Sequence, residues 1–94
     1  MDIHERLEQF SDDYLKFDGV KARLSQRPDL HAFIWIDRRF PGGTNEIVGA
    51  AEHDEIYLDV TDDQIEQLTD DEIHDLVRCG VRHDSSNGGV CMFV

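Results

Sequence analysis

Apolar side chains recur every three or four residues along the first part of the chain. Their positions are Ile3, Leu7, Phe10, Tyr14 and Phe17. Because this spacing places them on one face of a helix, the pattern predicts an amphipathic helix over 3–17 that ends near Gly19. A short basic helix or turn is expected over 20–27, ended by Pro28, because the residue before a proline avoids the helical conformation.

Three later segments carry the patterns of strands. Residues 31–37 (HAFIWID) are bulky on both alternating faces, which predicts a strand that is covered on both sides. Residues 46–51 predict a weaker strand antiparallel to it, and residues 55–60 alternate as a half-buried strand does. The loop 41–45 (PGGTN) and a tight turn at 52–54 separate these strands.

An eight-residue pattern then occurs twice in succession, as TDDQIEQL at 61–68 and TDDEIHDL at 69–76. Each copy opens with Thr and has Gln or Glu three residues later, which is the signature of a helix capping box. Two Asp residues follow each Thr, where the helix dipole favours negative charge. The repeat predicts two short consecutive helices or one bent helix, with Gly80 placed to end the second.

The last residues are typical of a hairpin. Residues 81–84 lead into the turn 85–89 (SSNGG), where Asn87-Gly88 favours positive φ angles, and an apolar strand follows at 90–94. That strand must be covered by the core or by another subunit. The order of elements predicts a single α+β domain over 1–94, with an N-terminal helix, an antiparallel sheet of about four or five strands, and two short helices before a C-terminal hairpin.

Charge is distributed very unevenly along this chain, whose formal net charge is -12. The segment 40–77 has no Lys or Arg but holds twelve carboxylates. Five of them are expected in the first turns of helices, where the helix dipole stabilises negative charge: Asp62, Asp63, Asp70, Asp71 and Glu72. The other seven are not stabilised in this way: Glu46, Glu52, Asp54, Glu55, Asp59, Glu66 and Asp75. Because like charges repel and no opposite charge stands at i+4, we interpret the segment as a surface for a partner.

A carboxylate array can occupy the Lys and Arg groups of a nucleic-acid channel as a decoy, or bind a basic toxin or nuclease. In size and charge the chain is similar to phage-encoded inhibitors of host defence, including anti-CRISPR proteins, and to immunity proteins against nuclease toxins. We therefore predict a non-enzymatic protein that binds a basic protein or nucleic-acid-handling complex, without binding nucleic acid directly. The predicted contact residues are Glu46, Glu52, Asp54, Glu55, Asp59, Asp63, Glu66, Asp70 and Asp75.

The alternative is a homodimeric structural or assembly module whose acidity serves only solubility. Its interface would be formed by strand 90–94 and Trp35. The basic residues between 16 and 39 would then pair with the acidic half within one chain or between subunits.

Metal and catalytic chemistry are not expected. Cys79, His83 and Cys91 are possible zinc ligands, but they lack the paired C-x2-C or H-x3-H spacing of structural zinc sites. We interpret the cysteines as reduced core thiols. The pairs His53-Asp54 and His74-Asp75 have no candidate nucleophile nearby, so we expect no enzyme and no cofactor.

No membrane association is expected either. The first residues have neither the basic nor the apolar region of a signal peptide, and no apolar stretch reaches the roughly 18–20 residues of a membrane helix. The expected location is the cytoplasm, of a bacterial host if the chain is phage-encoded.

Overall fold

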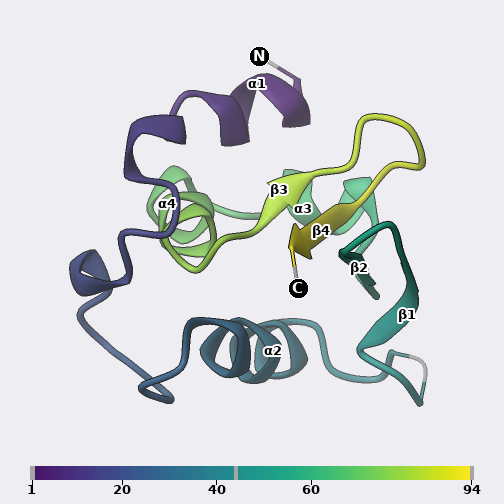
Figure 1. Cartoon of the computed structure of the whole chain (residues 1–94), viewed down its shortest axis with the longest axis horizontal. Coiled ribbons are helices and arrows are strands. Elements are labelled where there is room, and N and C mark those ends of the chain that lie inside the picture. Colours follow the sequence, from purple (N-terminus) through teal and green to yellow (C-terminus); the bar gives the residue numbers. More distant parts are fainter. Residues whose placement is uncertain (1, 44, 94) are drawn as a thin grey trace.

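The computed structural model describes residues 2–43 and 45–93, so Thr44 of the predicted loop and Val94 of the predicted last strand lie outside the described residues. It confirms the predicted α+β fold (Figure 1). The helices are α1 (Ile3–Glu8), α2 (Pro28–Arg39), α3 (Asp62–Glu66) and α4 (Asp70–Arg78), with short 3-10 turns η1 (Ser11–Asp13) and η2 (Phe17–Gly19). The strands are β1 (Val48–Glu52), β2 (Glu55–Leu58), β3 (Arg82–His83) and β4 (Val90–Phe93).

The sheet is antiparallel, with the strand order β1-β2-β4-β3. The predicted turn between β1 and β2 is confirmed, and its two central residues, His53 and Asp54, have positive φ angles of 53° and 64°. Such angles at both positions match the right-handed twist of the flanking strands. The turn therefore sets the register in which Glu52 lies opposite Glu55.

The prediction of a strand at 31–37 was wrong, because this segment forms most of helix α2. Pro28 begins the helix at a position where its missing N–H costs nothing, whereas we expected it to end an element. Asp29 in the first turn and Arg38 and Arg39 in the last turn complement the helix dipole. The helix buries His31, Ala32 and Ile36 on one side, and in Figure 1 it lies across the sheet from α1. Consequently β1 pairs with β2 and not with residues 31–37.

The predicted N-terminal helix is shorter than expected. It ends at Glu8, and the chain then turns through η1 and η2. Leu15 lies between these turns with a left-handed φ of 60°, and its N–H donates to the carbonyl of Val77 at 3.2 Å. Phe10, Tyr14 and Phe17 still pack against the core, although from separate segments. Residues 20–27 form no helix.

Both capping boxes predicted from the repeat are present, so the prediction of two consecutive helices is confirmed. The Gln64 N–H donates to Thr61 Oγ1 at 3.2 Å, and the Thr61 N–H donates to Gln64 Oε1 at 3.0 Å. Thr69 and Glu72 make the same reciprocal pair at 3.2 and 2.8 Å. Each cap satisfies two N–H groups that the helix cannot pair internally, which is worth about 1 kcal/mol. Gly80 follows α4 with a φ of 96°, as expected of a helix stop.

The C-terminal hairpin pairs β3 with β4 as predicted, but its positive φ angles fall on Gly88 and Gly89 and not on Asn87. Strand β4 lies between β2 and β3, and its residues Val90–Met92 are buried. The chain's own core therefore covers this strand. Cys79 and Cys91 are free, buried thiols, and burial raises the pKa of Cys79 to about 12.

Candidate acidic binding surface

The β1–β2 turn carries three of the predicted contact residues. Glu52 and Asp54 are exposed and form no ion pair with any described residue. Glu55 is different, because its Oε1 lies 2.8 Å from Arg82 Nη2 on β3. The Tyr57 hydroxyl donates to Glu55 Oε2 at 3.3 Å. Burial, followed by the negative charges of Glu55 and Glu52, raises the pKa of Tyr57.

Helix α3 carries two further predicted residues. Asp63 and Glu66 are exposed, and neither is paired with a charged group in the described part of the chain. Their neighbour Asp62 has a structural role, because its Oδ1 accepts the Gly89 N–H at 2.6 Å. Asp63 and Glu66 therefore present negative charge to solvent, whereas Asp62 joins α3 to the β3–β4 turn.

Arginines from α1, α2 and α4 itself compensate the carboxylates of α4. Arg6 Nη2 on α1 lies 3.2 Å from Asp70 Oδ1. Arg78 Nη1, at the end of α4, lies 2.8 Å from Asp75 Oδ1. In addition, Arg39 on α2 lies 3.4 Å from Glu72. Asp71, which the sequence analysis explained by the helix dipole alone, is exposed and has no ion pair within the described residues.

Glu46 and Asp59, the remaining predicted residues, flank the hairpin at its other end. The Asp59 N–H donates to the Ile47 carbonyl at 2.7 Å, which extends the pairing of β1 and β2. Both residues line a cavity of about 350 Å³ between α2 and the hairpin, together with the aromatic side chains of Phe33 and Phe40. They are therefore set apart from the exposed carboxylates of the turn.

The exposed carboxylates form two groups. We call Glu52 and Asp54 the turn patch, and Asp63 and Glu66 the helix patch. The turn patch adjoins the end of β4, where Glu55 pairs with Phe93, whereas α3 contacts the start of β4 through Gly89. A strand of this length spans about 10 Å. The two patches thus lie at opposite ends of one short strand, and Glu55, Asp70 and Asp75 are neutralised by arginines.

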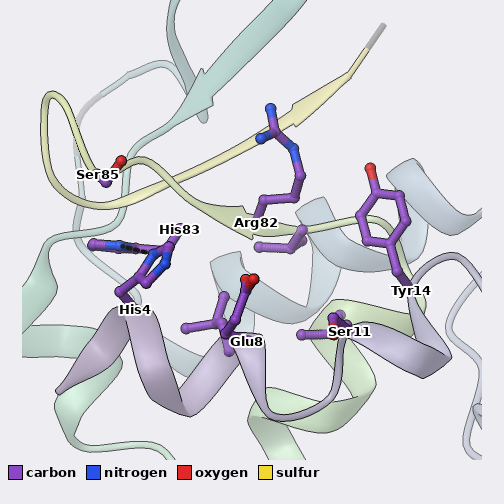
Figure 2. A pocket seen from close by; sticks show the side chains of 10 residues that line it. His4, Glu8, Ser11, Tyr14, Arg82, His83 and Ser85 are labelled. Carbon is purple, nitrogen blue, oxygen red and sulfur yellow. Dashed lines mark hydrogen bonds between the residues drawn. The ribbon is translucent and has the colours of Figure 1, made fainter.

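The structure also contains a cavity, lined by both polar and apolar side chains, that the sequence analysis missed. It has a volume of about 400 Å³ and lies between α1 and β3. Figure 2 shows the polar side chains that surround it: His4, Glu8, Ser11, Tyr14, Arg82, His83 and Ser85. The spacing of His4 and Glu8 predicts that they share a helix face. Nothing in the sequence indicates that β3 brings His83 to them.

The other histidines noted in the sequence have local roles. His74 Nε2 lies 2.7 Å from Asp13 Oδ2, and its ring stacks on Phe10 with a centroid distance of 4.2 Å. His53 is exposed in the β1–β2 turn. Across residues 2–43 and 45–93, no three or more His, Cys, Asp or Glu side chains are arranged to hold a metal ion.

No family model, curated protein or solved structure matches the chain. In the described part of the chain, no helix has the length and apolar character needed to span a membrane.

Proposed function

We propose that this protein is a non-enzymatic binding protein that engages a basic partner through the turn patch and the helix patch. The observation that supports the proposal is that arginines neutralise only some of the carboxylates in segment 40–77. Arginines from outside the segment pair with Glu55, Asp70, Glu72 and Asp75, whereas both patches stay exposed without a cation. Repulsion within such a surface is relieved when a partner supplies the missing positive charge.

The partner class that fits this surface is a protein with clustered Lys and Arg residues. Nucleic-acid-handling proteins have such clusters because they bind phosphates. By occupying them, the chain would act as an inhibitor of a nuclease or a nucleic-acid-binding complex, in the cytoplasm of a bacterial host if it is phage-encoded. Its net charge of -12 would steer association, raising the rate by about 10–10³-fold at low salt, and would repel nucleic acid itself.

The test is affinity capture from host lysate at low and high salt, with the captured protein identified by mass spectrometry. The charge-reversal variant changes Glu52, Asp54, Asp63 and Glu66 to Lys. Because these side chains make no ion pair in the described structure, the variant should remain folded. We expect the wild-type chain to capture a basic protein, with capture falling as salt rises and lost in the variant.

A matched control separates patch recognition from net charge. Changing Glu5, Asp12, Asp29 and Asp37 to Lys alters the charge equally, and these residues are exposed outside both patches. The control should keep the partner. Equal loss in both variants, or capture that the patch variant leaves intact, would refute a role for the patches.

A homodimeric assembly module is the alternative function, but β4 (Val90–Phe93), the described part of its predicted interface strand, already lies between β2 and β3, and Cys91 pairs with both. Phe93 is the exposed apolar residue of this strand, with 57% of its surface accessible. Sedimentation at two salt concentrations distinguishes the two proposals. A salt-insensitive dimer that captures no partner would support the module.

A further inference from the structure

A further cavity, of about 400 Å³, lies between α2 and α4. His31, Trp35 and Arg38 line it from α2. Because they are four and three residues apart, these side chains leave one face of the helix. Glu72 and Asp75 line the cavity from α4. Sites for small molecules usually have volumes of about 300–1,000 Å³, so this cavity is large enough for one.

His31 supplies a hydrogen-bond donor that has no acceptor in the described structure. Only 3% of its surface is accessible, and its Nδ1 accepts the Leu24 N–H at 3.0 Å. Burial lowers the pKa of His31, so the ring is neutral near pH 7 and its single proton lies on Nε2. No described residue accepts a hydrogen bond from this Nε2–H. A buried donor without a partner is destabilising, and a ligand that supplies an acceptor removes that cost.

Asp75 supplies a complementary acceptor on the α4 side. Its Oδ1 accepts a hydrogen bond from Arg78 at 2.8 Å, whereas its Oδ2 has no hydrogen-bond partner among the described residues. The charge of Asp75 also acts on His31, where it opposes the larger effect of burial on the pKa. A hydroxyl group both accepts and donates, so one ligand hydroxyl can accept from His31 Nε2 and donate to Asp75 Oδ2. The two residues therefore favour a hydroxylated ligand.

Trp35 and Arg38 determine the rest of the ligand's chemistry. The flat indole of Trp35 is half-buried at the cavity, where a planar ring can stack on it. Arg38 is exposed and has no ion pair within the described residues, so its guanidinium can bind an anionic group. The surrounding sequence also favours an anion, because six of the nine Lys and Arg residues lie in 16–39, against three Asp residues.

We propose that the cavity between α2 and α4 binds a mononucleotide, with the base stacked on Trp35, a ribose hydroxyl between His31 and Asp75, and the phosphate at Arg38. This goes beyond the proposed function and does not depend on it, because none of these residues belongs to either patch. A mononucleotide is compatible with the net charge of -12, since one phosphate is repelled far less than the many phosphates of a nucleic acid.

The experiment titrates the full-length chain with AMP and, separately, with UMP, which represent purine and pyrimidine nucleotides. Trp35 is the only tryptophan in the sequence, so its fluorescence reports directly on the cavity. Free tryptophan serves to correct for the light that each nucleotide absorbs. We expect saturable quenching by at least one nucleotide, with a dissociation constant of about 1 mM or below. Absence of saturable quenching by both would overturn the proposal.

Two analogues of AMP separate the predicted contacts. Adenosine lacks the phosphate, and 2′,3′-dideoxy-AMP lacks the ribose hydroxyls. If AMP binds, each analogue should bind at least about tenfold more weakly, because each leaves a polar protein group without its partner. For UMP the corresponding analogues are uridine and 2′,3′-dideoxy-UMP. Equal affinity for the nucleotide and its dideoxy analogue would overturn the roles of His31 and Asp75.

The variant Arg38→Gln tests the phosphate contact, and it should fold because this side chain is exposed and makes no ion pair in the described structure. We expect it to weaken nucleotide binding about tenfold and to leave nucleoside binding unchanged. Arg27→Gln is the matched control, because it removes the same charge at an exposed position that does not line the cavity. Equal loss of nucleotide binding in both variants would overturn the assignment of Arg38.

Discussion

Arg82 on β3 reaches across β4 to Glu55 on β2, with Nη2 and Oε1 2.8 Å apart. Its guanidinium also lies 4.0 Å from the centroid of the Phe93 ring, at the end of β4. One side chain thus contacts two strands beyond its own. It covers an exposed aromatic ring and cancels a carboxylate that would otherwise add to the charge of the turn patch.

Replacing Arg82 should therefore destabilise the sheet. We expect Arg82→Ala to lower the free energy of unfolding by about 1–2 kcal/mol, because it leaves Glu55 without its charged partner and uncovers Phe93. Urea denaturation measures the change. When Arg82→Ala is made in a Glu55→Gln background, it should lower the free energy of unfolding by less, since no carboxylate loses its partner. An equal cost in both backgrounds would show that the ion pair contributes nothing.

Stability should also depend on the protonation of His31. This ring is buried in α2, and its Nδ1 accepts the Leu24 N–H at 3.0 Å. Burial lowers the pKa of His31 below its ordinary value of 6.5. The unfolded chain consequently binds a proton at a pH where the folded chain does not, and stability falls as the pH drops below about 6.5.

The measurement is urea denaturation at a series of pH values from neutral to mildly acidic. In His31→Gln the amide oxygen can accept the Leu24 N–H, and the titrating group is gone. We expect a flatter stability profile in this range for the variant. Carboxylates whose pKa is lowered, such as Asp13 and Asp84, lose their contribution only at more acidic pH, below their ordinary value of 3.8. A wild-type free energy of unfolding that does not change between neutral pH and mild acid would contradict the predicted contribution of His31.

Substituting Gly42 and Gly89 distinguishes the cost of backbone strain from the cost of a steric clash. Gly89 has a φ of 73°, and a Cβ there would lie 2.6 Å from the Val60 carbonyl oxygen. Gly42 has a similar φ of 85°, but a Cβ would meet nothing within 4 Å. We expect Gly42→Ala to cost about 1 kcal/mol from strain alone, and Gly89→Ala to cost more because backbone atoms must move. Thermal unfolding compares the two directly, and equal costs would mean that the hairpin shifts freely to accept the Cβ.

Elements that depend on interactions between residues close in sequence could be predicted from the sequence. The Thr61 and Thr69 capping boxes, the turn at 52–54 and the Gly80 stop form as expected, because each depends on backbone and side-chain groups no more than four residues apart. Residues 31–37 were misjudged because a bulky apolar run fits a strand or a buried helix equally well. Pro28 and the terminal charges, combined with a core that buries Ala32 and Ile36, favour the helix.

Charge compensation and the histidine pair required the folded chain. Arg6 is 64 residues from Asp70, and His4 is 79 residues from His83, so no local pattern joins them. The sequence is enough to show that segment 40–77 carries negative charge without internal cations. Which carboxylates stay exposed depends on where α1, α2 and β3 place their arginines, because an ion pair forms only between groups that packing brings within a few ångströms.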